Sequence, residues 1–418
     1  MIDQLPFVKR CLDTFGVSGE ILPLPGEIDT NYLVTQKNSK KWVLKISPED
    51  YDIQVLDFQE KLLEHLEKSS LKASAPMMKI AANGKKTLYL KDDTNRTRAV
   101  RMLTWIEGDL WSKVSPVTNE LLFSLGQKAG QTTLALKGFD HHIASRVFDW
   151  NLDHAEWTEN YIHLIDPSLQ TAFSKVISQY KESKSDLEKL RKSVIHNDAN
   201  DNNIITQTDF GSNIVVSIID YGDAVKSTII NDVAVTATYA IMGQNDPLQA
   251  ACAVLKGYHN SFPLEAAEVR YLYCLIGMRL VISLTKSAIN KQKEPENEYL
   301  QISDQAAGRL LIQWSGIHPS LAYYSFRAAI GLMPHPHETE VNSFFKDQKI
   351  ELNRMFPTEN TNFISQPDMS IGSTFIGHKQ EYNDAVTFWE KIKKWKKSHA
   401  NTIPANGFLE VRPFYSTD

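Results

Sequence analysis

Residues 194–205 read VIHNDANDNNII, and this stretch contains the densest group of candidate catalytic and metal-binding side chains in the chain. An apolar, β-branched run stands at each end, and between them His196, Asp198 and Asn203 follow the spacing H-x-D-x-x-x-x-N. In a tight loop between two strands, this spacing holds the aspartate against an attacking hydroxyl and turns the asparagine oxygen toward a magnesium ion. The stretch therefore predicts a phosphoryl-transfer loop in which Asp198 is the catalytic base and Asn203 is a metal ligand.

A second acidic segment follows at residues 215–223, which read VVSIIDYGD. Asp220 stands at the end of an apolar strand and is followed by an aromatic residue and a glycine. A hard divalent cation takes oxygen ligands and bridges nucleotide phosphates, so an aspartate in this position is typical of a metal-binding loop. We expect Asp220 to be the second metal ligand.

The third chemical element is Lys45, which stands among apolar neighbours in the strand WVLKI at residues 42–46. Burying a lysine is costly unless it meets an anion, and nucleotide phosphates would supply one. We expect Glu60, on the following amphipathic helix, to be its fixed counter-charge. Asp57, three residues earlier on much the same helix face, is the competing choice.

Each of these features has a plainer interpretation when it is taken alone. A single lysine in a strand is more often an edge or surface residue, and clusters of Asp and Asn more often mark turns. Glu60 alone would be a solvated helix residue. Here, however, the chain runs in the order lysine strand, acidic helix, catalytic loop, metal-binding aspartate. This order is hard to obtain from turn chemistry and favours a kinase.

Length and composition limit the alternatives. At 418 residues the chain exceeds what one hydrophobic core usually supports, so two or more structural units are expected. Hydrophobic residues make up 42% and charged residues 23%, which argues against disorder, collagen-like repeats or a membrane protein. Apolar runs such as 214–219 are shorter than the roughly 20 residues that cross a bilayer. The N-terminal MIDQLP carries no export signal.

Charge and cysteine usage point the same way. The net charge of −5 argues against a nucleic-acid partner, and the most basic stretch, 391–397, is typical of the wet face of an amphipathic helix. The HPHE at 335–338 offers two histidines without a clear third ligand, so we expect no metal site there. The cysteines form no CxxC pair, which predicts neither disulfides nor zinc and favours a reducing cytoplasm. They are Cys11, Cys252 and Cys274.

The first hundred residues alternate strand and turn patterns. Helical spacing is found at 4–15 and around 55–66, and Asn83-Gly84 predicts a hairpin turn. The predicted strands are 19–24, 31–35, 41–46, 78–82, 87–90 and 99–106. We expect an antiparallel sheet with a helix packed on it.

Long helical periods follow Gly108, interrupted by the two acidic segments, and regular periodicity is lost from about residue 334. The predicted helices are 117–136, 156–179, 232–241, 246–260, 264–289 and 303–314. The predicted fold is therefore α+β. We expect an N-lobe at 1–105 that binds nucleotide, a helical C-lobe at 106–333 with the catalytic loop and substrate pocket, and an extension or linker at 334–418.

Together these motifs resemble the aminoglycoside phosphotransferase and choline kinase superfamily, with its bilobal protein-kinase-like fold, and within it the hydroxylysine kinase branch. The resemblance covers roughly residues 1 to 330. Besides the segments above, it rests on the following stretches: LPGEIDTNY at 24–32 as the nucleotide-loop hairpin, RMLTWIEG at 101–108 as the hinge, MRLVIS at 278–283 and PENEYL at 295–300. The usual Gly before the catalytic Asp is Asn197, which tolerates left-handed backbone angles, and the usual Phe after the metal Asp is Tyr221.

The resemblance implies a magnesium-dependent transfer of the γ-phosphoryl group of ATP or GTP to a small amino alcohol such as 5-hydroxylysine. It implies that Asn31 and Lys45 contact the nucleotide and that the backbone of Leu103, Thr104 and Trp105 meets the purine. His196 is expected to brace the loop. Asp223 would attract a cationic substrate. Arg279 is either a partner for a substrate carboxylate or a structural ion-pair residue.

Other functions remain open at this point. Choline, ethanolamine, homoserine or an aminoglycoside are alternative acceptors, and a nucleotide-binding pseudokinase is the alternative from a different class. A P-loop is excluded because Lys79 stands where the motif of Gly84-Lys85 needs its first glycine. Residues 407–418, GFLEVRPFYSTD, resemble the region after the kinase in bacterial fusions. That resemblance implies a PLP-dependent phospholyase or aminotransferase-like module as a fused or neighbouring partner. From the composition and the short apolar runs we expect no membrane partner.

Overall fold

The computed structural model describes residues 5–26, 28–209, 212–293 and 298–334. The chain divides into two compact units, Met1–Ile317 and His318–Asp418. This division falls before the boundary expected at residue 333. In the second unit, the described residues include helix α10 (Pro319–Ala329). The predicted extension from residue 335 onward, with the HPHE, lysine-rich and C-terminal stretches, lies outside the described residues.

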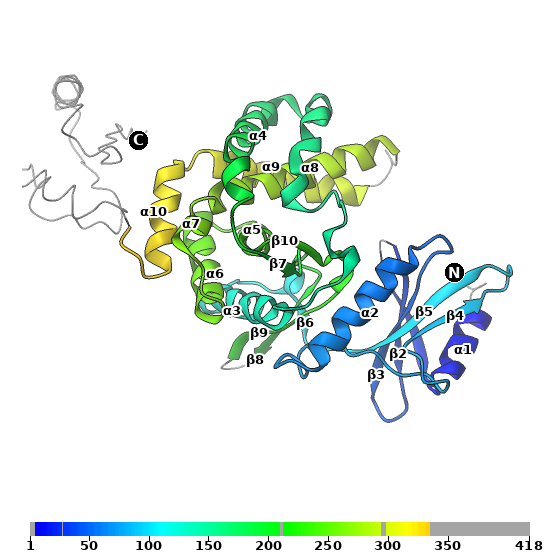
Figure 1. The fold of residues 1–418 in the computed structure, drawn as a ribbon. Coiled ribbons are helices and arrows are strands. Elements are labelled where there is room, and N and C mark those ends of the chain that lie inside the picture. The colour runs from blue at the N-terminus through cyan, green and yellow to red at the C-terminus, as the bar shows by residue number, and fades with distance from the viewer. Residues whose placement is uncertain (1–4, 27, 210–211, 294–297, 335–418) are drawn as a thin grey trace, which may run out of the picture. The chain divides into compact units, whose positions relative to one another are not determined.

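The N-terminal sheet is antiparallel, as expected, and has the order β1-β2-β3-β5-β4. Its strands are β1 (Glu20–Leu24), β2 (Thr30–Thr35), β3 (Lys41–Ile46), β4 (Thr87–Lys91) and β5 (Thr97–Thr104), coloured blue to cyan in Figure 1. The prediction of a strand at 78–82 is wrong, because only an isolated bridge between Met78 and Leu103 forms there. The Asn83-Gly84 turn does form, with Gly84 at φ +80°.

Two helices accompany this sheet, and their apolar faces enter different cores. Helix α1 (Leu5–Thr14) buries Phe7, Val8 and Leu12 in one core with the strands. Helix α2 (Ile53–Glu67), capped by Asp52, buries Phe58, Leu62 and Leu66 in another. That second core also contains residues that follow the N-terminal sheet in the chain, including Leu136, Val194 and Tyr221. Packing therefore couples α2 to the segments that carry the predicted chemistry.

The rest of this unit is mostly helical, as expected. Its α-helices are α3 (Asn119–Leu136), α4 (Pro167–Leu187), α5 (Ile229–Ala240), α6 (Pro247–Ser261), α7 (Ala266–Val269), α8 (Leu272–Lys293) and α9 (Glu298–Ser315). The helix expected at 156–179 is instead a 3-10 segment, η4 (Leu152–Leu164), followed by α4, because Asp166 caps a new helix with Pro167 in its first turn. Shorter 3-10 turns are η2 (Trp111–Lys113), η3 (His142–Ser145) and η5 (Tyr221–Asp223).

Two small antiparallel ribbons place the acidic segments. Strand β7 (Lys192–Ile195) pairs with β10 (Val225–Thr228), and β8 (Ile204–Asp209) lies between β6 (Asp109–Leu110) and β9 (Ser212–Ile218). The segment 196–203 joins β7 to β8, and 219–224 joins β9 to β10. Because both connections leave one ribbon and enter the other, the two loops lie together.

From the sequence we expected no segment long and apolar enough to span a membrane, and helix α8 departs from this expectation. By length and composition it passes as a membrane-spanning candidate, with a mean hydropathy of 1.5 over its most apolar window. However, 72% of that window is buried inside the structure, and Arg279 lies within it, so α8 is the core helix of this unit.

Candidate active site

The catalytic loop turns at Asn197, whose φ of +66° confirms the predicted left-handed backbone. Its amide N donates to Asp232 Oδ1 at 3.0 Å, and its side-chain Nδ2 donates to Asp223 O at 3.4 Å. A glycine at this position could make only the first of these bonds. Asn197 therefore ties the catalytic loop both to α5 and to the second acidic loop.

His196 braces the two loops from inside the protein. Asp198 N donates to His196 Nδ1 at 3.3 Å, so the ring proton lies on Nε2, which donates to Ile219 O at 3.0 Å. Burial lowers the pKa of His196 to about 4 and keeps the ring neutral. Tyr221 packs against the ring with a centroid distance of 4.7 Å. This geometry is that of the structural brace expected from the sequence.

Asp198 is held on both carboxylate oxygens. Oδ2 accepts from Asn203 Nδ2 at 2.8 Å and from Asn200 Nδ2 at 3.0 Å, while Oδ1 accepts from Arg279 Nη2 at 3.1 Å. Burial raises the pKa of Asp198 to about 7, against the lowering effect of Arg279 and with Asp223 adding to the rise. A fixed carboxyl group with a pKa near neutrality suits a proton acceptor.

Arg279 lies behind this carboxylate with its side chain only 1% exposed. Its guanidinium carbon lies 4.5 Å from the ring centre of Trp150 and 5.3 Å from that of Tyr239, and its Nη1 donates to Trp150 O. Of the two roles left open by the sequence, the structure displays the ion pair, and its partner is the predicted catalytic base. The side chain thus supports Asp198 directly.

Asp220 meets Lys45 across the two halves of the unit. Its backbone adopts φ +61°, Oδ1 accepts from Gly222 N at 3.2 Å, and Oδ2 accepts from Lys45 Nζ at 3.1 Å. Burial acts to raise the pKa of Asp220, but the charge and hydrogen bond of Lys45 outweigh it, and the pKa is lowered. Two residues 175 positions apart are therefore brought together as the sequence predicted.

The donor set fits a magnesium ion. The Nδ2 of Asn203 is engaged by Asp198, which turns its amide oxygen away from that carboxylate, and Asp220 contributes carboxylate oxygens. Among the described residues no cluster of three His, Cys, Asp or Glu side chains forms a metal cage. Magnesium typically uses one or two protein oxygens together with nucleotide phosphates and water, so these two ligands suit it.

Glu60 is not the counter-charge of Lys45, and this part of the prediction is corrected. Its Oε2 accepts from Thr87 Oγ1 at 2.5 Å, on the side of α2 that faces β4. The competing choice, Asp57, pairs with His141 at 3.1 Å. Instead, Asp29 lies 3.6 Å from the Lys45 amine. The residue of α2 that faces the second acidic loop is Gln59, whose Nε2 donates to Gly222 O at 3.4 Å.

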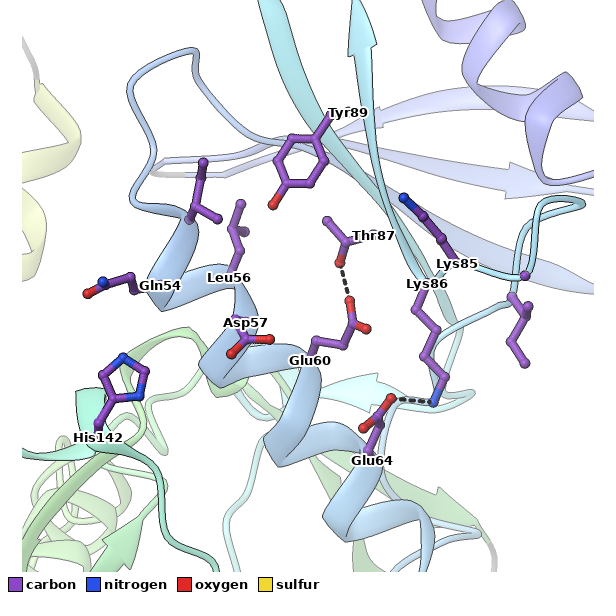
Figure 2. A pocket seen from close by; sticks show the side chains of 13 residues that line it. Gln54, Leu56, Asp57, Glu60, Glu64, Lys85, Lys86, Thr87, Tyr89 and His142 are labelled. Carbon is purple, nitrogen blue, oxygen red and sulfur yellow. Dashed lines mark hydrogen bonds and ion pairs between the residues drawn. The ribbon is translucent and has the colours of Figure 1, made fainter.

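Figure 2 shows the surroundings of Glu60, a pocket of ≈ 580 Å³. It is lined by α2 and the β4 region, including Asp57, Glu64, Lys86 and Tyr89, with His142 at one side. Lys45, Asp198 and Asp220 do not line it. Glu60 therefore belongs to a separate hollow between α2 and the β4 region.

The other predicted nucleotide residues lie on the inner strands β2 and β5 of the sheet or directly after β5. Asn31 stands opposite Lys45 in the β2–β3 register, and its Nδ2 donates to Pro25 O at 3.2 Å, which holds the hairpin loop. Thr104 N donates to Met77 O and Trp105 N to Lys41 O, so both backbone donors have partners within the protein. Leu103 lies inside β5, paired with Val43. The contact of these residues with a nucleotide stays a prediction.

Asp223, the expected partner of a substrate cation, lies in η5 near the predicted catalytic aspartate. Its charge contributes to the raised pKa of Asp198, and its backbone oxygen accepts from Asn197. The binding of a substrate cation by Asp223 stays a prediction.

Sequence reasoning missed four polar residues of this region: the buried Gln59, Arg101 and Asp232 and the half-buried Asp29. Arg101 could have been found by the argument applied to Lys45, since it is a charged residue inside an apolar strand. Asp29 lies in the hairpin motif without standing out from a turn residue. Asp232 was assigned only as the start of a helix, although it accepts from Asn197 N and Thr133 Oγ1.

Comparison with known proteins gives concordant results. Residues 20–268 match the model of the phosphotransferase enzyme family. The chain is 26% identical over 319 residues to a hydroxylysine kinase of Danio rerio, covering 73% of this chain and 88% of that protein. It is 29% identical over 307 residues to a hydroxylysine kinase of Xenopus laevis, covering 68% and 81%.

Two solved structures share the fold at low identity. Amicoumacin kinase hAmiN, solved with AMP-PNP, Ca2+ and Ami, superposes with a TM-score of 0.55 at 16% identity and covers 74% of this chain and 94% of that one. Aminoglycoside 2'-phosphotransferase-IIIa, solved with GDP, gives a TM-score of 0.52 at 12% identity and covers 74% and 99%. These likenesses confirm the predicted α+β, protein-kinase-like fold.

Proposed function

The chain belongs to the phosphotransferase enzyme family, and we propose that it transfers the γ-phosphoryl group of ATP or GTP to the hydroxyl of a small amino alcohol, 5-hydroxylysine first among them. Family membership makes it a small-molecule kinase. The acceptor and the nucleotide are our proposal. They are supported by the hydroxylysine kinases it resembles and by relatives solved with AMP-PNP and GDP.

The observation that carries the proposal is the convergence of a lysine, two carboxylates and an amide oxygen in one place. Lys45 comes from β3, Asp198 and Asn203 from the catalytic loop, and Asp220 from the second loop. Phosphoryl transfer needs little covalent chemistry from the protein. It depends on positioning and on the neutralisation of phosphate charge, and these residue types supply both.

Asn203 and Asp220 would hold the magnesium ion, which supplies neutralisation of charge on the phosphate oxygens. Lys45 holds the α- and β-phosphates, and Asn31, Leu103, Thr104 and Trp105 form the nucleotide wall. Asp198 orients the acceptor hydroxyl and takes its proton. The raised pKa of Asp198 supports this role, since a base works best with a pKa near the working pH.

The acceptor is selected by charge. Asp223 attracts the ammonium group of an amino alcohol. The guanidinium of Arg279 donates to Asp198, Trp150 O and Tyr239 Oη, and its remaining N–H capacity is offered to the α-carboxylate of an amino acid. Trp150 and Tyr239 already flank Arg279, so these two rings do not serve as a cage for a quaternary ammonium such as that of choline.

The decisive experiment is coupled nucleotide turnover with Mg-ATP and Mg-GTP against a panel of acceptors. The panel contains 5-hydroxylysine, ethanolamine, choline, homoserine and an aminoglycoside. We expect turnover with hydroxylysine, dependent on magnesium and absent in Asp198→Asn. If the chain binds Mg-nucleotide but turns over none of the panel, the pseudokinase interpretation replaces ours.

Three further parts of the proposal concern context. We place the enzyme in the cytoplasm, in accord with its three free, buried cysteines. We assign residues 1–105 to nucleotide binding and 106–333 to the acceptor. A PLP-dependent module acting on the phosphorylated product is proposed as a fused or neighbouring partner; its motif lies outside the described residues.

A further inference from the structure

Arg101 is a buried cation in the N-terminal sheet for which the proposed mechanism has no use. It lies on β5 directly opposite Lys45 on β3, and it is only 5% exposed. Two positive side chains on neighbouring strands repel each other and lose hydration. They need a common anion.

Asp29 supplies that anion. Its Oδ2 lies 2.7 Å from Arg101 Nη2 and 3.6 Å from Lys45 Nζ, and its Oδ1 accepts from Ser47 Oγ at 2.7 Å. The Asp29 side chain is 10% exposed. A carboxylate fixed by three partners in a buried place keeps one orientation, so its charge acts on Lys45 from one direction.

Arg101 also anchors this carboxylate to α2 and to the metal loop. Its Nη1 donates to Gln59 Oε1, and the amide of Gln59 donates in turn to Gly222 O. A chain of side-chain contacts therefore runs from the nucleotide hairpin, through β5 and α2, to the residues beside Asp220. The position on α2 that could bring an acidic partner toward Lys45 carries neutral Gln59, and the negative charge comes from the hairpin instead.

Lys45 thus lies between two carboxylates, at 3.6 Å from Asp29 and 3.1 Å from Asp220. Asp220 is the proposed metal ligand. If it were the sole counter-charge, the lysine would follow it and compete with the metal for its oxygens. We propose that Asp29, fixed by Arg101, is the positioning residue of the nucleotide site: it holds the Lys45 amine toward the phosphates and leaves Asp220 to the metal.

This inference deepens the proposed function and rests on it, so the test reads nucleotide binding, which needs no acceptor. The affinity for Mg-ADP is measured by calorimetry on the full chain for wild type, Asp29→Asn, Lys45→Met and the double variant. We expect Asp29→Asn to weaken binding about tenfold and to raise the magnesium concentration that gives half-maximal binding. The isosteric amide keeps the side-chain shape.

The Lys45→Met background separates positioning from stability. If Asp29 acts through Lys45, Asp29→Asn causes no further loss of affinity once the amine is absent. If it merely supports the sheet, the loss is the same in both backgrounds, and the inference is overturned. Should Asp29→Asn fail to fold, Asp29→Ser, which also removes the negative charge, carries the same comparison.

Asp92→Asn is the matched control. Asp92 also pairs with two cations in this half of the unit, Arg96 at 3.4 Å and Arg98 at 3.5 Å, and it is 12% exposed, but it lies outside the network. We expect its nucleotide affinity to equal that of wild type. Wild-type chain that binds Mg-ADP but turns over no acceptor defeats the proposed function alone, whereas Asp29→Asn with unchanged affinity defeats this inference alone.

Discussion

Asp198 and Asp220 show how two aspartates of one site can be set up in opposite ways. Each lies 3.1 Å from a cation, Arg279 in one case and Lys45 in the other, and burial acts on both to raise the pKa. Yet the pKa of Asp198 rises to about 7 and that of Asp220 falls. The distance to the nearest cation therefore does not set the protonation state.

The remaining neighbours decide the difference. Asp198 is 19% exposed and has two further carboxylates, Asp223 and Asp220, acting on it. Asp220 is 45% exposed and gains a hydrogen bond from Gly222 N as well as from Lys45. One carboxylate is thus prepared to take a proton and the other to keep its negative charge for a cation.

The largest expected effect comes from removing the proton acceptor. We expect Asp198→Asn to lower kcat about a thousandfold, since the amide cannot accept the hydroxyl proton, while the affinity for Mg-nucleotide changes little. Single-turnover kinetics and calorimetry on the same preparation measure the two quantities. Asp201→Asn, three residues along the loop, is the control and should stay within about twofold of wild type. Equal kcat values for Asp198→Asn and wild type would remove Asp198 from the mechanism.

Removing the cation of the other carboxylate should have a smaller effect on a different parameter. We expect Lys45→Met to lower kcat/KM for nucleotide about a hundredfold, because the phosphates lose a charge-assisted contact and Asp220 loses its partner. The control is Lys41→Met. Lys41 is a half-buried lysine on the same strand as Lys45, and it pairs with Glu107. If both variants lose the same activity, the contact between Lys45 and Asp220 has no special role.

The sequence could predict the contacts that depend on motif spacing but not those that depend on how a helix is rotated. The turn at Asn197, the brace at His196 and the meeting of Lys45 with Asp220 depend on motif spacing, and all three appear in the structure. The partner of Lys45 depends on the rotation of α2, where one residue turns the side chain by about 100°. The sequence pointed to Glu60, whereas Gln59 is the residue that faces inward.

Contacts between distant segments were the other limit. Arg279 lies 81 positions from Asp198, and spacing alone does not reveal which face of its long apolar helix meets the catalytic loop. Asp29 is likewise 72 positions from Arg101. Residues of this kind become recognisable only when buried charges are matched with one another in space.

The pH dependence of the reaction sharpens the comparison further. In the proposed mechanism activity requires ionised Asp198, so kcat/KM should fall as the pH drops through about 7. Arg279 lowers this pKa, so Arg279→Met should raise it and move the acidic limb to higher pH, with about a tenfold loss of kcat/KM near pH 6.5. The profile of kcat/KM against pH between 5.5 and 9 measures the shift. A limb that stays in place or moves to lower pH contradicts the assigned ion pair.

The smallest effects should appear in stability, and another pair of buried carboxylates provides the test. Burial raises the pKa of Asp232 to about 6. Hydrogen bonds from Asn197 N and Thr133 Oγ1 act to lower this pKa, but no cation adds to their effect, so burial prevails. Burial also acts to raise the pKa of Asp153, but hydrogen bonds and the charge of Lys192 lower it overall. Ionisation of Asp232 therefore destabilises the folded protein, and ionisation of Asp153 stabilises it.

The signs follow from proton linkage. Between about pH 4 and 6, folded Asp232 retains a proton that the unfolded chain has released, so its contribution to stability falls as the pH rises. Relative to wild type, Asp232→Asn should thus be more stable at pH 8 than at pH 4.5 by about 2 kcal/mol. Asp153→Asn should show the opposite trend in a lower pH range, because the stability that the lowered pKa of Asp153 gives is present above the unfolded pKa of about 4 and is lost as the pH falls below it. Urea denaturation at about pH 3, 4.5 and 8 measures both differences, and trends of the same sign in the two variants would show that the cation beside a buried carboxylate does not control its contribution.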